Sequence, residues 1–276
     1  MIPELRDGIQ PAHAERRLRE TATQGRNLVG SSAGQAVAIH QNNFLAWVGI
    51  AETQLRNVFS DPIAWERLYD ERHWQIYGLT QASPRAIELM NTAATVQAAW
   101  LDELADRLKR LADRLVAAPG QLTVVDTHVL LHFLPPDQID WPVVVGKPTV
   151  RLVLPLRVVE ELDEKKYTAR DDLADRARRL LSQLRTQLAP TAGAPTSLRT
   201  GVTIEVPVDD GPRQRTVDAD QEILDTCREL KSGGGPVVLV TDDTGVNLRA
   251  SSAGIQVIPM PEQYLRRKPQ PGDQAS

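Results

Sequence analysis

Val124-Val125-Asp126-Thr127-His128-Val129-Leu130-Leu131 is the stretch that decides the fold. An apolar, β-branched run over residues 122–125 ends in an aspartate, and an amphipathic segment over 127–133 follows at once. A short buried strand that turns directly into a helix is typical of a chain in which strands and helices alternate. The stretch therefore predicts an α/β domain in which Asp126 stands at the carboxyl end of the first strand.

The same alternation continues to the end of the chain. Further strands are expected at residues 149–155, 237–240 and 255–258, and helices at 157–166, 171–188 and 246–250. Residues 190–215, rich in proline, threonine, glycine and arginine, are expected to form an insertion in which 201–206 is a candidate extra strand. The expected fold class is therefore α/β with a mostly parallel central sheet.

The first part of the chain has a different character. Alanine, leucine, glutamine and arginine dominate, strand-like runs are absent, and a long helix is expected from Ser83-Pro84 to about Val116. The helical pattern stops at Ala117-Ala118-Pro119-Gly120. The chain should thus comprise an all-α domain over 1–118, an α/β domain over 119–267 and a disordered tail over 268–276.

Two patterns in the helical part have two readings each. A leucine seam, spaced by three and four residues, predicts either a helical hairpin or bundle or a homodimer contact; it comprises Leu101, Leu104, Leu108, Leu111 and Leu115. Four tryptophans predict either core anchors, the reading we favour, or surfaces that stack on unpaired bases; they are Trp47, Trp65, Trp74 and Trp100.

Composition excludes several classes of protein. The chain of 276 residues has one cysteine, no secretion signal and no apolar run of spanning length, so we expect a cytoplasmic protein with no membrane association. Its 32 basic and 36 acidic residues give a net charge of -4, which excludes a polycation that coats nucleic acid. The net charge does not exclude an enzyme that acts on nucleic acid, because divalent cations bound to a cluster of carboxylates can contact the phosphate.

Acidic residues stand where the expected strands end and helices begin. Asp126 and the pair Asp242-Asp243 follow strands directly, and Glu160-Glu161 lies in the first turns of the helix after residue 155. Asp218, Asp220 and Glu222 open a later helix. Each acid alone is explained by helix capping, but four acidic positions at one edge of a sheet would repel one another unless cations bind. Such hard oxygen ligands suit Mg²⁺ or Mn²⁺.

These segments resemble the four motifs of the PIN domain family. Asp126 matches the aspartate that ends the first strand, and Glu161, followed by Leu162-Asp163, matches the glutamate of the second motif, with Glu160 as its neighbour. Asp220, ahead of Ile223-Leu224, is similar to the third motif, for which Asp218 competes, and Leu239-Val240-Thr241-Asp242-Asp243 resembles the fourth. The resemblance implies a three-layer α/β/α fold. It covers nothing before residue 119. Many relatives follow the fourth motif directly with a polar residue, asparagine and leucine, whereas here Thr244-Gly245-Val246 intervenes before Asn247-Leu248.

The resemblance also implies an activity. Family members are metal-dependent nucleases that usually cut RNA, so the expected function is an endoribonuclease that hydrolyses phosphodiester bonds of single-stranded RNA with Mg²⁺ or Mn²⁺. Its catalytic and metal-binding residues would be Asp126, Glu161, Asp220 and Asp243, with Asp242 as an outer member. An inhibitor protein is an expected partner. The alternatives are a binding or assembly module without turnover, working through the leucine seam, and a structure-specific DNA nuclease.

Other polar residues have expected roles around this edge. Thr241 would orient a carboxylate or a water, and the candidates for phosphate binding are Lys165, Lys166, Arg213, Arg215 and Arg249. His128 and His132 lie one helical turn apart, but no third ligand completes a zinc pattern, so we expect ordinary partial burial. Cys227 has no cysteine partner and is expected to pack on a helix face.

Overall fold

The structure is a computed structural model that describes residues 2–31, 36–207 and 219–266. It divides into two compact units, one of residues 1–117 with 231–234 and one of 118–230 with 235–276. Arg213, Arg215 and Asp218 lie outside the described residues, as does the tail over 268–276. No described helix is both long enough and apolar enough to cross a membrane.

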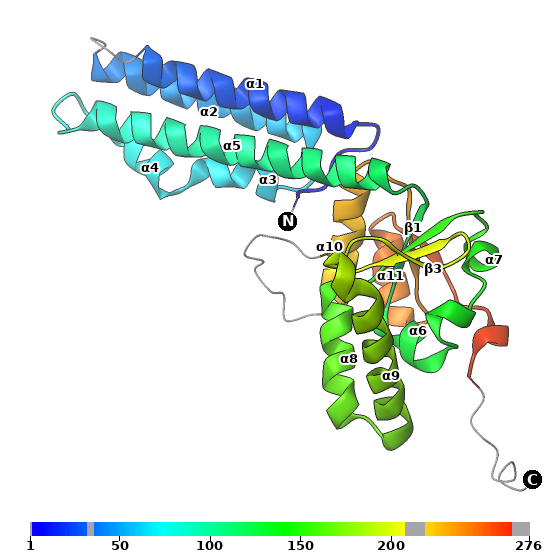
Figure 1. Ribbon diagram of the computed structural model, residues 1–276. Helices are drawn as coiled ribbons and strands as arrows, with labels where there is room; N and C mark the ends of the chain where they lie inside the picture. Colours follow the sequence, from blue (N-terminus) through cyan, green and yellow to red (C-terminus); the bar gives the residue numbers. More distant parts are fainter. Residues whose placement is uncertain (1, 32–35, 208–218, 267–276) are drawn as a thin grey trace, which may run out of the picture. The chain divides into compact units, whose positions relative to one another are not determined.

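The regular elements in the described part of the first unit are all helices, as expected, and an isolated antiparallel bridge joins Leu5 to Phe59. Three long helices lie side by side, and two short helices and one 3₁₀ turn connect the second to the third (Figure 1). The elements are α1 (Pro11–Gly30), α2 (Val37–Val58), α3 (Ile63–Glu66), η1 (Arg67–Tyr69), α4 (Glu71–Tyr77) and α5 (Ala86–Ala117). Alanine and leucine, which lose little side-chain freedom in a helix, fill the buried face of α5.

The leucine seam on α5 is internal packing. Leu101 and Leu108 are fully buried, Leu104 and Leu111 are nearly so, and α5 packs along the whole of α1. Apolar side chains already removed from water by the same chain offer no free energy to a partner. These four leucines therefore pack within the helical unit, as the interpretation as a helical hairpin or bundle expects, and Leu115 is half-buried. A homodimer through this unit stays a prediction.

The four tryptophans differ in burial, and Trp100 on α5 is half-buried. Trp47 is buried and donates its indole N–H to the carbonyl of Thr21 at 3.1 Å, and Trp65 is buried as well. Trp74 is 60% exposed, so the prediction that it is a core anchor was wrong. The physical reason is the shortness of α4, whose buried face is already taken by His73 and Ile76.

The second unit is an α/β domain. Its helices are α6 (Thr127–His132), α7 (Trp141–Val145), α8 (Leu156–Thr168), α9 (Asp171–Leu188), α10 (Ala219–Ser232) and α11 (Thr244–Ser252). Its strands are β1 (Gln121–Val125), β2 (Val150–Val153), β3 (Thr196–Arg199), β4 (Val202–Glu205), β5 (Val237–Val240) and β6 (Gln256–Ile258). Short 3₁₀ turns are η2 (Pro136–Gln138), η3 (Ala189–Thr191) and η4 (Glu262–Tyr264).

The six strands form one sheet in the order β3-β4-β2-β1-β5-β6. Every neighbouring pair is parallel except β3 and β4, which form an antiparallel hairpin at one edge. The insertion expected over 190–215 thus supplies two strands in its described part. A mostly parallel sheet with flanking helices, preceded by an all-helical region, confirms the predicted fold class (Figure 1).

Strand order defines where a site can form. From β1 the chain moves outward to β2 and β4, and it then returns to the other side of β1 through β5 and β6. The order reverses between β1 and β5, which pair in register up to Val125 and Val240. Ligands of open parallel sheets bind at the carboxyl ends of the strands at such a reversal. Asp126 and Thr241 come next after these two strand ends.

A buried ion pair attaches the edge hairpin to the sheet. The Arg151 guanidinium on β2 donates to Glu205 on β4 through two bonds, of 3.1 Å from Nε and 2.9 Å from Nη2. Its Nη1 donates to the carbonyl of Ala118 at 2.7 Å. The two side chains are 0% and 2% exposed. Both charges are thus neutralised and hydrogen-bonded inside the domain, which is the condition for burying them.

Candidate active site

Asp126 is the buried centre of the candidate site. It is 4% exposed and caps α6, because its Oδ1 accepts the backbone N–H of Val129 at 2.8 Å. Its Oδ2 accepts the hydroxyl of Thr241, which follows β5 on the neighbouring strand. The capping role and the site role therefore coexist in one carboxylate, because each oxygen has a different partner.

Thr241 joins the two central strand ends. Its side chain is buried, its hydroxyl donates to Asp126, and its Oγ1 accepts the backbone N–H of Asp243 at 3.0 Å. One hydroxyl thus fixes the buried carboxylate and the backbone that carries the second aspartate. The orienting role of Thr241 stays a prediction, and these two hydrogen bonds are the contacts through which it would act.

Asp243 caps α11 and stands at the surface. Its Oδ1 accepts the backbone N–H groups of Gly245 at 2.7 Å and Val246 at 3.0 Å, and Oδ2 takes no part in the cap. A Cβ placed on Gly245 would stand 3.2 Å from that Oδ1, closer than ordinary contact. The Thr244-Gly245-Val246 departure from the family pattern is thus the first turn of α11, and its glycine leaves room for the aspartate to fold back.

Glu161 is held beside Asp126 by a residue that the sequence reasoning did not select. Thr127, the residue after Asp126, is buried and donates its hydroxyl to Oε2 of half-buried Glu161 on α8. The position of Thr127 in the sequence could have identified it, because a hydroxyl next to an acid at a strand end lies at the same edge of the sheet. Glu160, the competing residue, instead pairs with Arg157 at 3.5 Å.

Asp220 is engaged differently from the other three acids. It opens α10, and its Oδ2 accepts from Nη2 of Arg249 on α11. Arg249 was expected to bind phosphate, but here it neutralises a predicted metal ligand. The two residues are about two-fifths exposed, so solvent screens the pair and it costs little to open.

The remaining predicted residues lie farther from this network. Asp242 is exposed between Thr241 and Asp243. Lys165 is exposed on α8, and its neighbour Lys166 pairs with Asp163 at 2.5 Å. The structure thus links Asp126, Asp243 and Glu161 through two threonines and leaves both lysines outside that network.

Burial dominates the electrostatics of Asp126. It raises the pKa of the carboxyl, because the charged form loses water, and the charge of Asp243 adds to this increase. Hydrogen bonds from Thr241 and Val129 oppose it, as does the nearby charge of His128. A cation at this edge would stabilise the ionised form.

The chemistry of the donors fits a hard divalent cation. Asp126, Glu161 and Asp243 supply only carboxylate oxygens, the ligands that Mg²⁺ and Mn²⁺ prefer. Within residues 2–31, 36–207 and 219–266, no three histidine, cysteine, aspartate or glutamate side chains form a group that could hold a metal ion. The carboxylates are joined through threonine hydroxyls instead, so an ion would have to take over part of those bonds.

Two other candidates for chemistry have structural explanations. The rings of His128 and His132 lie on α6 with centroids 4.3 Å apart. His132 is half-buried, as expected, whereas His128 is exposed, so the expectation of partial burial was wrong for His128. Cys227 on α10 is buried, and burial raises the pKa of its thiol to about 12. A thiol that stays protonated at neutral pH is a poor nucleophile.

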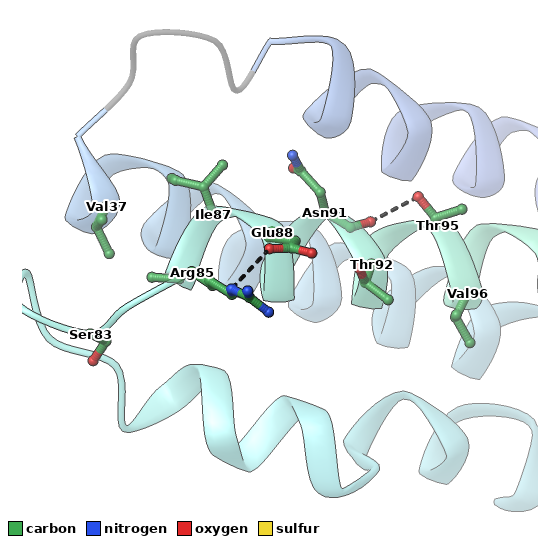
Figure 2. A pocket seen from close by; sticks show the side chains of 10 residues that line it. Val37, Ser83, Arg85, Ile87, Glu88, Asn91, Thr92, Thr95 and Val96 are labelled. Atoms are coloured by element: carbon green, nitrogen blue, oxygen red, sulfur yellow. Dashed lines mark hydrogen bonds and ion pairs between the residues drawn. The ribbon is translucent and has the colours of Figure 1, made fainter.

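The helical unit contains an open cavity of its own. Its volume is about 750 Å³, and it lies beside the start of α5, with Val37 of α2 at one end. Figure 2 shows the ion pair of Arg85 with Glu88 among apolar and polar side chains. The two charged groups of this pair are 3.9 Å apart. The cavity contains none of the predicted acids.

The match to a protein family covers the domain that carries these acids. The sequence model of the PIN domain family matches residues 123–260, half of the chain, from within β1 to just beyond β6. A comparison with curated proteins finds no match. Among solved structures, a domain of a functionally unknown protein from Methanocaldococcus jannaschii is similar with a TM-score of 0.34 and 16% identity, covering 55% of this chain and 97% of that one. The chain belongs to the PIN domain family.

Proposed function

We propose that this protein is a divalent-metal-dependent endoribonuclease that hydrolyses phosphodiester bonds of single-stranded RNA at the edge formed by Asp126, Glu161 and Asp243. PIN domains are generally nucleases, which supports the reaction class. The observation that carries the proposal is the hydroxyl of Thr241, which joins buried Asp126 to the backbone of Asp243 where the strand order reverses. Location in the cytoplasm and control by an inhibitor protein belong to the same proposal.

Asp126, Glu161 and Asp243 are the residues that would hold the cation, with Asp242 as an outer member. Asp220 would join them after exchanging its contact with Arg249 for the ion. Arg249, beside it, is the proposed phosphate-binding residue. When bound, the cation supplies Lewis acidity, which activates a water and offsets charge on the phosphate.

The chain's own residues supply orientation. Thr241 holds the Asp126 carboxylate through Oδ2, and the amide of Val129 holds it through Oδ1, so the carboxylate cannot rotate freely. Thr127 fixes Glu161 in the same way from the neighbouring position. Such preorganised groups lower the barrier because little has to move when charge develops.

Cleavage assays with a matched control test the proposal. The wild-type protein should cut single-stranded RNA when Mn²⁺ or Mg²⁺ is added, and Asp126→Asn and Asp243→Asn should each abolish the cut. Asp140→Asn is the control, because Asp140 caps α7 by accepting from Val143 yet takes no part in the network. Cleavage that survives in both site variants would contradict the proposal.

A second candidate is a PIN domain that binds nucleic acid without turnover. The lack of an ion-holding group among the described side chains favours it, as does the pairing of Asp220 with Arg249. This candidate predicts RNA binding but no metal-dependent products. A panel of RNA, single-stranded DNA and small phosphate esters also separates an RNA enzyme from a structure-specific DNA nuclease.

A further inference from the structure

An arginine cluster lies at the last turn of α6, the helix that Asp126 caps, and two of its three members contact that turn. It consists of Arg176, Arg179 and Arg266. Arg176 on α9 donates from Nη1 to the carbonyl of Leu131 at 3.1 Å, and the backbone N–H of Arg266 donates to the carbonyl of His132 at 3.1 Å. Two segments far apart in sequence thus meet at consecutive carbonyls of one helix end.

The segment that carries Arg266 is tied to this helix end by backbone pairing. Phe133 and Leu265 form an antiparallel bridge, and the N–H of Leu134 donates to the carbonyl of Tyr264 at 2.9 Å. Arg266 is therefore placed by main-chain contacts, and its half-buried side chain belongs to the domain surface.

The positive charges of the arginine cluster repel one another. Burial lowers the pKa of Arg266, and the charges of Arg176 and Arg179 lower it further. Burial lowers the pKa of His132 as well, and the charges of His128 and Arg176 add to that effect. Like charges gathered on a folded surface cost free energy unless an anion binds among them.

Acidic partners within the described residues offset little of this charge. Arg176 has Asp172 at 3.8 Å, whose side chain is 62% exposed. Arg179 donates to the backbone carbonyl of Asp175, whose carboxylate instead pairs with Arg178 at 2.5 Å. The Nε of Arg266 is buried and has no hydrogen-bond partner among the described residues.

Helix capping accounts for only part of the cluster. A cation at a helix carboxyl end is favourable, but the helix dipole supplies only about half a unit of negative charge there. Arg176 alone satisfies that role through Leu131. The other two arginines have no such explanation.

The arginine cluster lies at the end of α6, and Asp126 of the candidate active site caps its start. The charge of His128, near the start of α6, acts on Asp126, and its ring stacks on that of His132 near the end. Six helical residues rise about 9 Å, or two to three nucleotides at the roughly 3.4 Å spacing of a stacked strand. One nucleic-acid strand can therefore reach both places.

We propose that Arg176, Arg179 and Arg266 bind the backbone phosphates of the nucleic-acid strand a few nucleotides from the bond that is cut. The inference rests on the proposed function, because it names how the substrate of that site is held. Guanidinium groups bind phosphate oxygens through paired N–H donors. Contacts to phosphates position a strand without reading its sequence.

Binding measured without cleavage tests this inference separately from the nuclease proposal. Fluorescence anisotropy of a labelled single-stranded RNA is followed in EDTA over a range of salt concentrations. Arg179→Gln and Arg266→Gln should each weaken binding and reduce the slope of log K against log salt by about 0.7, the value for one lost phosphate contact on a single strand. Arg178→Gln, an ion-paired neighbour on α9, should change neither.

The outcomes are distinguishable. Unchanged affinity and unchanged salt slope in both cluster variants would overturn the inference, whatever the nuclease activity. If the wild-type protein binds RNA through these arginines but does not cut it, the phosphate site stands and only the nuclease proposal fails. Arg179 is exposed, and among the described residues its side chain makes one hydrogen bond, to a neighbouring turn, so its variant keeps the test valid if Arg266→Gln fails to fold.

Discussion

Replacing Thr241 by valine should weaken the α/β unit and disconnect the two central acids. The change keeps the shape of the side chain and removes only the hydroxyl. Asp126 then loses the donor to Oδ2, and the N–H of Asp243 loses its acceptor at 3.0 Å. Because Thr241 is 1% exposed, water cannot replace either partner without opening the structure.

The size of the effect follows from these two bonds. A hydrogen bond to a buried carboxylate contributes about 1.5–3 kcal/mol, and a neutral one about 0.5–1.5 kcal/mol. The free energy of unfolding should therefore fall by about 2–4.5 kcal/mol in Thr241→Val. Thr241→Ser keeps the hydroxyl and loses one methyl group, so its loss should be about 1 kcal/mol.

Urea unfolding with pulsed labelling of the Cys227 thiol measures the free energy of unfolding of the α/β unit, which contains Thr241. Cys227 is buried in α10 and its pKa of about 12 keeps it unreactive in the folded protein, so labelling reports unfolding of the α/β unit. Equal stabilities of the valine and serine variants would show that the hydroxyl does not stabilise the strand ends as described.

Three further predictions concern packing, buried charge and pH. A Cβ on Gly25 would stand 2.6 Å from a tryptophan ring, so Gly25→Ala should cost about 1–3 kcal/mol in thermal unfolding; Gly49→Ala, with nothing within 4 Å, should stabilise α2. Arg151→Met leaves the charge of buried Glu205 uncompensated and should lower the free energy of unfolding by about 3–5 kcal/mol. Adding Glu205→Leu should restore most of that stability. A double variant as unstable as the single one would contradict this prediction. Folding raises the pKa of the Asp126 carboxyl above its ordinary value of about 3.8. The contribution of this carboxyl to the free energy of unfolding is therefore complete below the pKa of the unfolded chain and is lost as pH rises through the pKa of the folded protein. The Asp126→Asn variant should thus gain stability relative to the wild type as pH rises from acid to neutral. Melting temperatures of the two proteins that change in parallel with pH would refute burial as the cause of the raised pKa.

Local sequence patterns predict the strand ends well because each depends on adjacent residues. An apolar run followed by an acid places Asp126 and Asp243 at carboxyl ends, and parallel pairing brings those ends together. The capping explanation and the site explanation were posed as alternatives, but both aspartates cap helices and remain candidate ligands. A carboxylate has two oxygens and can serve two partners.

Pairings between distant side chains could not be predicted in the same way. The bond between Asp220 and Arg249 depends on the mutual placement of α10 and α11, which no spacing along the chain encodes. The same holds for Arg176 and Arg266, which contact consecutive carbonyls of α6 from α9 and from the segment after the last strand. Trp74 illustrates the limit of composition, since burial depends on how much of a short helix faces the core.

The choice of Glu161 over Glu160 offers the most direct test of the acidic edge as one metal site. Titration calorimetry with Mn²⁺ on the wild-type protein, Glu161→Gln and Glu160→Gln compares two adjacent residues on one helix. Glu161 contacts Thr127 beside Asp126, whereas Glu160 pairs with Arg157. Glu161→Gln should weaken Mn²⁺ binding about tenfold or more, and Glu160→Gln should leave it unchanged. Equal affinities in all three proteins, or no Mn²⁺ binding by the wild type, would contradict a shared metal site at this edge.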